Sequence, residues 1–428
     1  MPTTTTTLPS EQAASSQSTS SSPHPQGEHS VILIELFAGI ASTSIALEQL
    51  QIPTGKVLPL LVECDDALSK VLAIKFPRAR HMRCVLQLLD KNYLLLEDFA
   101  KAATAANPSA LVLVTAGFPC QDLSSAKISK SMGLLGKRSC LFAAVVLVLS
   151  KLRTCLPDKK ILFIVENVAS MEPKWRRLLD KTFGVPSKTF DASASCAATR
   201  RRLVWTNIIQ DEPLPKAKVD SSAVLDEGWT TASGVGLLHD SRGDSHRWDC
   251  FLRPFGPGSP PEFPSDFTHL GPMAYHAANL AFKKDISTID LALVLDKLEA
   301  ADSLRQGRDF NVPARCALIE WIHKGGGDRL VRPLHGRERA RALTYPESAA
   351  SASDTAPLPF SDLDWRESAA FGNSFPLPVI RHILSPLAAH LQQGSPLPLL
   401  PVLANDTSWA AVFAHLGLEA PKMPPSMG

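Results

Sequence analysis

Four short apolar runs constrain the fold of this chain more than any other feature. They are Ile32–Phe37, Leu58–Val62, Leu111–Val114 and Ile161–Val165. Short apolar runs bounded by turn residues are typical of buried strands in a parallel sheet. In open α/β sheets, ligands bind and chemistry takes place at the carboxyl ends of such strands. The sequence therefore predicts an α/β fold whose functional residues directly follow these runs.

Two reactive side chains stand at such positions. Cys120 lies in Phe-Pro-Cys-Gln after the third run, and Glu166 lies in Glu-Asn-Val after the fourth. A nucleophile and a carboxyl acid in one cleft form an arrangement for covalent catalysis. Taken singly, each has an ordinary alternative: a structural buried thiol for Pro-Cys and a helix cap for Glu-Asn.

The first run leads into a small-residue turn, Ala38–Ser42, and then into a predicted helix at Ser44–Leu50. A strand, a tight turn and a helix start together form a nucleotide cradle, in which the helix N-terminus offers N–H groups to the ligand. Glu63 follows the second run, where an acidic ligand for a ribose hydroxyl is expected. Asp65 and Asp66 come next, and either of them is also a candidate helix cap.

Further along the chain, the order of the motifs resembles that of the cytosine-5 DNA methyltransferases, over residues 32–387. The context of Cys120 and the stretches Asp191–Asn207 and Leu377–Leu387 look closest to the eukaryotic de novo branch of that family. The matching blocks are ELFAGIA (Glu35–Ala41), Glu63, GFPCQDLS (Gly117–Ser124), VENV (Val165–Val168), TRRRLVW (Thr199–Trp205), RPLHGRERARALTYPE (Arg332–Glu347) and FGNS (Phe371–Ser374).

The resemblance implies a doubly wound, mostly parallel sheet of the class I S-adenosylmethionine-dependent methyltransferase type, with a smaller inserted domain. The expected segments are a disordered Ser/Thr-rich tail at 1–29, a catalytic domain at 30–207, a target-recognition domain at 208–331, a C-terminal return of the catalytic domain at 332–391 and a Pro/Leu-rich tail at 392–428. A helix is expected at 286–300, a second at 377–391 that packs back on the sheet, and a short third near 408–416.

The chemistry of the reaction agrees with this assignment. Carbon 5 of cytosine becomes nucleophilic only after a group adds to carbon 6, and a thiolate such as that of Cys120 is well suited to this addition. The addition places charge on ring nitrogen 3, where Glu166 would supply a proton. Arg200 and Arg202 alternate along a predicted strand and would stabilise negative charge. Without the other motifs, these two arginines would suggest a solvated strand edge.

The resemblance also implies S-adenosyl-L-methionine as the cofactor. His81 stands where family members usually carry an aspartate for the adenine amine. The implied cofactor contacts are Phe37, Ala38, Gly39, Ile40, Ser42, Glu63, Cys64, Asp65, Gly117, Pro119, Leu141, Asn373, Ser374 and Phe375.

The implied substrate is double-stranded DNA. Residues 208–331 contain 13 Lys/Arg against 18 Asp/Glu, so DNA contact would depend on local basic residues. Lys127 and Lys130 after the catalytic cysteine, and Arg305 and Arg308 in the recognition stretch, are the candidates; a solvated loop is the alternative for the first two. The sequence context of the target cytosine stays open, as does the choice between de novo and maintenance activity. A homo-oligomer or a paralogous partner is also consistent with the sequence.

Composition narrows the class of protein. The eight cysteines form no Cys-x-x-Cys pair, so we expect no metal. No apolar run approaches the roughly 18 residues that favour a membrane span, and the first residues do not resemble a secretory signal. The resemblance implies a nuclear location.

Three other functions are compatible with parts of the sequence. A tRNA cytosine-5 methyltransferase shares the catalytic core, but the Cys-Phe-Thr signature of that branch is missing. A non-catalytic regulatory paralogue would keep the fold, although the intact catalytic residues argue against it. A dinucleotide oxidoreductase would need a turn with three glycines, and this turn has one.

Overall fold

The computed structural model describes residues 30–124, 132–198, 200–210, 212–217, 222–226, 336–346, 374–400 and 408–424, together with shorter pieces between them. Within this part of the chain, no helix combines the length and the apolar composition that a membrane span requires. The described cysteines Cys64, Cys84, Cys120, Cys140, Cys155 and Cys196 are all free thiols.

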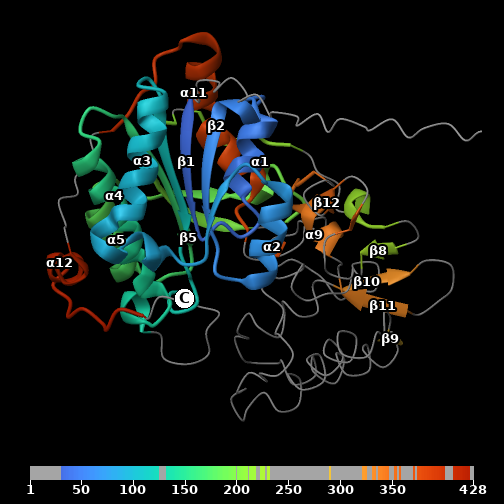
Figure 1. The fold of residues 1–428 in the computed structure, drawn as a ribbon. Coiled ribbons are helices and arrows are strands. Elements are labelled where there is room, and N and C mark those ends of the chain that lie inside the picture. Colours follow the sequence, from blue (N-terminus) through green and yellow to red (C-terminus); the bar gives the residue numbers. More distant parts are fainter. Residues whose placement is uncertain are drawn as a thin grey trace, which may run out of the picture.

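A seven-stranded sheet forms the centre of the molecule (Figure 1), with strand order β3-β2-β1-β4-β5-β7-β6. All neighbouring pairs are parallel up to β5, whereas β7 runs antiparallel to both β5 and β6. The predicted doubly wound, mostly parallel sheet is confirmed. The strands are β1 (Val31–Leu36), β2 (Val57–Val62), β3 (Arg80–Met82), β4 (Leu111–Gly117), β5 (Ile161–Val168), β6 (Lys188–Asp191) and β7 (Arg201–Thr206).

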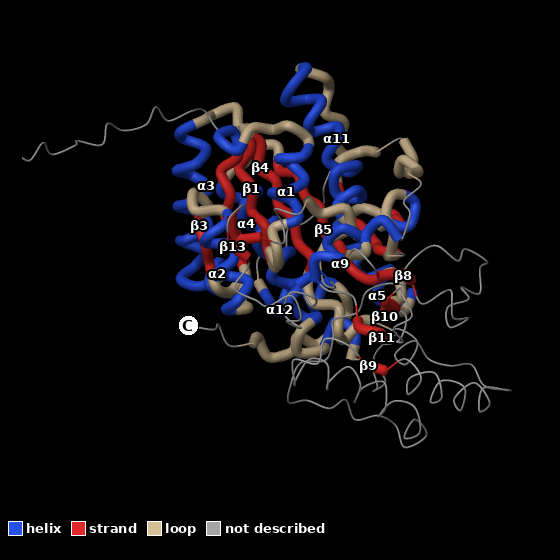
Figure 2. The backbone as a smooth tube through the Cα atoms, turned by 90° about the vertical axis from the view of Figure 1, so that its right-hand side faces the viewer, coloured by secondary structure: helices blue, strands red, loops and turns tan. Residues whose placement is uncertain are grey.

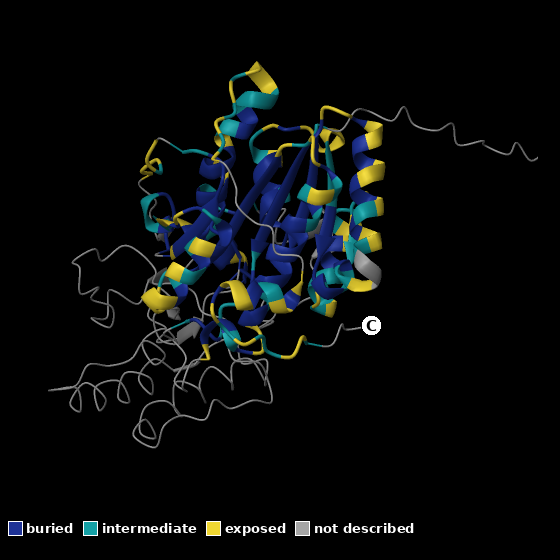
Figure 3. Cartoon of the chain, turned by 90° about the vertical axis from the view of Figure 1, so that its left-hand side faces the viewer, coloured by how far each residue is buried: buried dark blue, intermediate teal, exposed yellow. Residues whose placement is uncertain are grey.

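The apolar runs form strands because both faces of the sheet are covered. Every residue of β1 is buried, and side chains on a strand alternate between the two faces. Ile32 and Ile34 belong to one apolar core, and Val31 and Leu33 belong to the other. Figure 3 shows that buried residues fill the sheet, while the outer sides of the helices are exposed.

Helices pack on both faces of this sheet (Figure 2). The first core includes residues of α3, α4, α5 and α12, and the second core includes residues of α1, α9 and α11. The helices are α1 (Ser42–Gln49), α2 (Asp66–Lys75), α3 (Leu94–Ala106), α4 (Phe142–Cys155), α5 (Pro173–Phe183), α9 (Gly336–Ala342), α11 (Leu377–Gln393) and α12 (Trp409–His415).

Two helices return from the C-terminal part of the chain to the catalytic core. The expected helix at 377–391 is confirmed as α11, which packs with α1 and donates a hydrogen bond from Gln392 Nε2 to Leu50 O (2.8 Å). The expected helix near 408–416 is confirmed as α12. The described elements thus include C-terminal segments on both faces of the sheet.

The described part of the predicted recognition stretch contains a small antiparallel sheet of order β8-β10-β11-β9. Its strands are β8 (Trp229–Thr231), β9 (Ile289–Asp290), β10 (Trp321–Lys324) and β11 (Leu330–Pro333); β12 (Ser351–Ser353) and β13 (Ala356–Pro357) form a separate pair. The expected helix at 286–300 is wrong at β9, because residues there pair with β11 instead of forming a helical turn. The division of the chain into segments stays a prediction.

Helix α12 covers part of α4 through an aromatic contact. The rings of Phe413 and Phe142 meet edge to face with centroids 5.3 Å apart, and Phe413 is fully buried. Ser408 caps the helix by accepting a hydrogen bond from Ala411 N on its Oγ (3.1 Å). Helix α4 is almost entirely buried, and buried residues of α12 belong to the same first core.

We predict that Phe413→Ala lowers the free energy of unfolding by about 3 to 5 kcal/mol, since it removes a buried ring and leaves a cavity. Urea unfolding of the full chain measures this loss. His415→Ala, on the exposed side of the same helix, is the matched control and should change stability by less than about 0.5 kcal/mol. Equal losses in the two variants would contradict the packing role of α12.

Candidate active site

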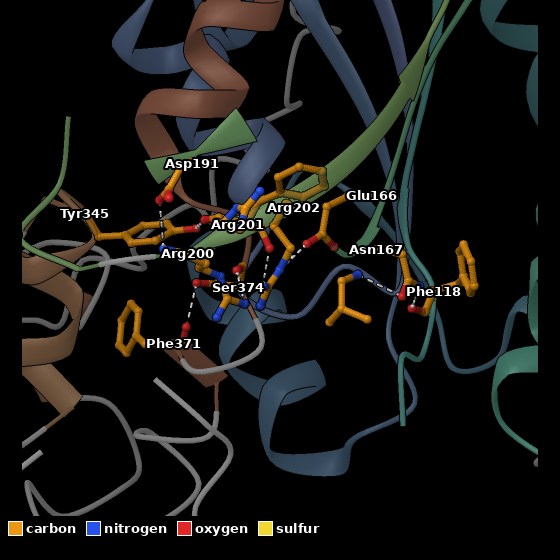
Figure 4. Close-up of polar contacts among 12 residues, drawn as sticks. Phe118, Glu166, Asn167, Asp191, Arg200, Arg201, Arg202, Tyr345, Phe371 and Ser374 are labelled. Carbon is orange, nitrogen blue, oxygen red and sulfur yellow. Dashed lines mark hydrogen bonds and ion pairs between the residues drawn. The ribbon is translucent and has the colours of Figure 1, made fainter. Parts of the chain in front are cut away.

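The ends of β4, β5 and β7 bring the predicted catalytic residues together. Gly117, three residues before Cys120, pairs with Glu166 of β5, and Val168 of β5 pairs with Arg202 of β7. Figure 4 shows the arginines directed toward Glu166 and the C-terminal return. The convergence predicted for Cys120 and Glu166 follows from parallel strands whose carboxyl ends share one edge.

Glu166 is buried and forms an ion pair with Arg202, with 2.6 Å between Oε1 and Nε. Burial raises the pKa of this carboxyl, while Arg202 and Arg200 act in the opposite direction. The residue therefore retains a proton more readily than an exposed glutamate. It lies within strand β5, so the alternative of a Glu-Asn helix cap is wrong.

Cys120 is partly exposed, and its thiol faces the same charged groups. Burial raises its pKa, Arg202 and Arg200 lower it, and Glu166 raises it further. A positive neighbour favours the thiolate, which is the nucleophilic form. The residue is of intermediate exposure and packs against the first core, so the alternative of a buried structural thiol stays open.

The backbone beside Cys120 is held from two sides. Leu123 N and Ser124 N both donate to Cys120 O at 2.9 Å. Asn167 Nδ2 donates to Phe118 O at 2.9 Å and thereby ties β5 to the Pro-Cys segment. These bonds leave the Cys120 backbone little freedom to move relative to Glu166.

Sequence reasoning missed the pair Asp122 and Ser139. Asp122 Oδ2 accepts hydrogen bonds from Arg138 N and Ser139 N (both 3.1 Å), and Ser139 Oγ donates to Pro119 O (2.7 Å). These contacts join two segments on either side of the loop that follows Cys120. The acidic residue two positions after the cysteine was the signal in the sequence.

The two arginines have different partners. Arg200 donates from Nη2 to Ser374 O (2.7 Å), whereas Arg202 pairs with Glu166 and donates to Arg201 O (2.9 Å). Arg200 is 2% exposed and Arg202 is 8% exposed, so the alternative of a solvated strand edge is wrong. Arg202 links β7 to β5, and Arg200 links the start of β7 to the C-terminal return.

The turn after β1 has an unusual backbone. Phe37, Gly39 and Ala41 have φ of 55°, 58° and 60°, and two of them are not glycine. Such strained positions persist where the surrounding structure imposes them, and they concentrate at ligand sites. Glu63 lies against this turn, since its Oε2 accepts a hydrogen bond from Gly39 N and its Oε1 accepts one from Asp65 N, both at 2.8 Å. Burial raises the pKa of Glu63.

Glu35 corrects one expectation about this turn. The N–H groups at the start of α1 were expected to face a ligand, but Thr43 N donates to Glu35 Oε1 (2.8 Å) and Ser44 N to Oε2 (3.3 Å). Ser44 Oγ also donates to Oε2 (3.0 Å). A buried carboxylate from β1 therefore caps the helix, and burial raises its pKa to about 7.

Next to the turn, Asp65 caps α2 by accepting hydrogen bonds from Ala67 N (2.9 Å) and Leu68 N (3.1 Å). This is the helix-cap alternative, and a cofactor contact of Asp65 or of the exposed Cys64 stays a prediction. His81 hydrogen-bonds Phe76 O through Nε2 (3.0 Å). Asp66 pairs with Arg83, which also donates to Cys64 O (3.1 Å).

The remaining predicted cofactor residues are distributed around the same strand ends. Ala38, Ile40, Ser42, Ser374 and Phe375 are buried, while Phe37, Gly39, Gly117, Pro119 and Leu141 are partly exposed. Asn373, Lys127, Lys130, Arg305 and Arg308 lie outside the described residues. The described part of the chain contains no cluster of three His, Cys, Asp or Glu side chains arranged for a metal ion.

Comparison with known families adds independent information. Residues 31–191 match the model of the C-5 cytosine-specific DNA methylase family. The matched segment spans less than half of the chain. It includes β1 to β6 and contains both Cys120 and Glu166.

Two solved structures resemble the chain at 16% sequence identity. The Entamoeba histolytica methyltransferase EhMeth has a TM-score of 0.46 over 85% of this chain and 99% of its own. An E. coli prophage protein assigned as a DNA modification methyltransferase has a TM-score of 0.45 over 85% of this chain and 100% of its own. These low scores carry no argument about activity. No curated protein matches the sequence.

We predict that the stability contribution of Glu35 depends on pH. Its pKa rises from 4.5 to about 7 on folding, so the folded state binds this proton more tightly. The contribution is fully present below about pH 4.5 and is lost as the pH rises to about 7, a change of about 3 kcal/mol. Glu35→Gln has no proton to lose, so its stability relative to wild type should increase across this window.

Urea unfolding at several pH values between about 5 and 8 measures the difference. Glu48→Gln on the exposed side of α1 is the matched control and should show no such increase. A constant difference between Glu35→Gln and wild type would mean that Glu35 is ionised throughout.

Proposed function

We propose that this protein methylates carbon 5 of cytosine in DNA through a covalent adduct with Cys120. The observation that carries the proposal is the placement of the Cys120 thiol beside a buried glutamate and two buried arginines, where β4 and β5 end and β7 begins. The family match over residues 31–191 supports the same reaction class.

The residues divide the chemistry between them. The Cys120 thiolate would form a bond to carbon 6 of the cytosine ring, and Glu166, whose pKa burial raises, would hold and deliver the proton that ring nitrogen 3 takes up. Carbon 5 is thereby made nucleophilic. After methylation, a water molecule would take the carbon 5 proton, the carbon–sulfur bond would break to return the Cys120 thiolate, and ring nitrogen 3 would return its proton to Glu166.

The arginines favour the thiolate form of Cys120. Arg202 and Arg200 both lower the pKa of Cys120, which raises the thiolate fraction above what burial alone would allow. Because Arg202 also contacts Glu166, it holds that carboxyl group in place. The low dielectric around these groups makes each contact stronger than it would be in water.

The turn after β1 fits S-adenosyl-L-methionine. Two non-glycine residues with positive φ, Phe37 and Ala41, form a strained tight turn, and the carboxyl group of Glu63 lies against it. Glu63 would accept a ribose hydroxyl on a lone pair that its two backbone contacts leave available. When bound, the cofactor supplies an electrophilic methyl group. Ser374 and Phe375 would close the pocket.

The proposal also includes how the DNA substrate is bound. Cytosine inside a duplex is out of reach, so the base would be flipped into the site. Lys127, Lys130, Arg305 and Arg308 would contact phosphates. Likeness of Asp191–Asn207 to the eukaryotic de novo branch supports that branch, and a nuclear location would follow from a chromosomal substrate.

We predict that Cys120 traps DNA that contains 5-fluorocytosine. Fluorine at carbon 5 cannot leave as a proton, so elimination is blocked and the adduct accumulates as a denaturation-resistant complex in the presence of cofactor. Cys120→Ser should form no such complex, because a serine hydroxyl is a far weaker nucleophile at neutral pH.

Cys155→Ser is the matched control, since Cys155 is the last residue of α4 and its Sγ donates to Leu152 O of the same helix (3.6 Å). This variant should trap like wild type. Transfer of a labelled methyl group is measured in parallel on duplex DNA and on tRNA. Trapping by Cys120→Ser would refute the nucleophile, and methylation of tRNA alone would refute the DNA substrate.

We predict that Glu166→Gln slows adduct formation by about 100-fold or more, because an amide cannot transfer the proton that ring nitrogen 3 needs. The variant also removes the negative charge that pairs with Arg202, which lowers the fraction of active protein. The rate is therefore measured per active site by single-turnover trapping. Glu172→Gln, which changes an exposed acid four residues after β5, is the control. A rate within threefold of wild type would remove Glu166 from the mechanism.

A further inference from the structure

Tyr345 carries a buried hydroxyl group that has no part in the proposed reaction steps. It follows α9 after a turn in which Thr344 has a φ of 62°, and its N–H donates to Ala340 O (2.9 Å). The side chain is 3% exposed, and its ring packs edge to face on Phe371 with centroids 5.5 Å apart. The backbone and the ring therefore both hold the hydroxyl in one place.

The hydroxyl contacts two segments that are predicted to bind the cofactor. It donates to Phe375 O (2.5 Å) and lies 2.6 Å from Ser42 Oγ. Burial raises the pKa of Tyr345, so the phenol keeps its single proton. That proton points to the Phe375 carbonyl, which can only accept. Ser42 must therefore donate to the tyrosine oxygen, and the chain of hydrogen bonds has one direction.

The same return also holds a base-side residue. Ser374, next to Phe375, accepts the hydrogen bond of Arg200 Nη2 on its carbonyl oxygen (2.7 Å), and its Oγ donates to Phe371 O (2.8 Å). Figure 4 shows Tyr345, Ser374 and Arg200 side by side. A continuous series of contacts thus runs from the turn after β1, through Tyr345 and the return, to Arg200.

We propose that Tyr345 is a positioning residue that couples the cofactor pocket to the base-binding side of the site. The proposal rests on the proposed function and extends it. Loss of the hydroxyl would leave Phe375 O and Ser42 Oγ without their shared partner in a dry environment. The return could then settle in other positions, and Arg200, which is attached to it, would move with it.

The test replaces Tyr345 by Phe, which keeps the ring packing and removes only the hydroxyl. Tyr93→Phe is the matched control, because Tyr93 lies at the start of α3 with its ring near Lys151. Calorimetry of the full-length protein with S-adenosylhomocysteine gives both Kd and stoichiometry. We expect Tyr345→Phe to raise Kd about five- to tenfold at unchanged stoichiometry, and Tyr93→Phe to leave Kd unchanged.

A second readout follows the base side without any cofactor. Addition of Cys120 to carbon 6 allows the hydrogen on carbon 5 to exchange with water, so tritium release from DNA labelled at carbon 5 reports that addition alone. We expect release by Tyr345→Phe to slow at least threefold. A residue with only a structural role would lower the active fraction but would change neither Kd nor the rate per active site.

A double-mutant cycle tests the link to the turn. If Ser42 donates to Tyr345, the combination of Ser42→Ala and Tyr345→Phe should raise Kd no more than the worse single variant. Multiplicative effects would refute this link. Unchanged Kd and unchanged tritium release in Tyr345→Phe, with normal binding by wild type, would refute the coupling alone. Failure of wild type to bind S-adenosylhomocysteine would refute the proposed function and the coupling with it.

Discussion

The buried contact between Glu166 and Arg202 is the interaction on which the rest of the site depends. Moving two charges out of water is costly, and their attraction offsets this cost only when the geometry is good. Antiparallel pairing of β7 with β5 supplies that geometry, because it places Arg202 across from the end of the strand that carries Glu166. Arg202 also acts on Cys120, so it lowers the pKa of both Glu166 and Cys120 against the larger effect of burial.

Around this pair, buried side-chain hydrogen bonds link segments of the described fold that are distant in sequence. Asn167 attaches β5 to the Pro-Cys segment, Arg200 attaches the β7 entrance to the C-terminal return, and Tyr345 attaches that return to the turn after β1. Each bond lies in a buried environment where an unmade partner is expensive. These contacts connect the segment that contains Cys120 and Glu166 with the C-terminal return and the turn after β1.

The parts of this arrangement that were predictable depend on local patterns. Apolar runs identified the strands, and the parallel pairing of β4 and β5 made it possible to infer that Cys120 and Glu166 converge. The sequence placed Glu35 in a strand. Its capping of α1 depends on how the turn between β1 and α1 folds, which composition does not reveal. The contact between Ser42 and Tyr345 joins positions 303 residues apart, and no periodicity encodes such a pair. Strand β9 was missed because two residues paired with a distant strand carry little local signal.

The placement of α11 and α12 on opposite faces of the sheet has a consequence for synthesis on the ribosome. Both apolar faces formed by residues 31–206 receive part of their cover from helices that end at Gln393 and His415. While the chain is still being made, the sheet is present without these helices and exposes surfaces that attract other chains. A chain that has emerged only as far as β7 would therefore expose apolar surface that favours aggregation.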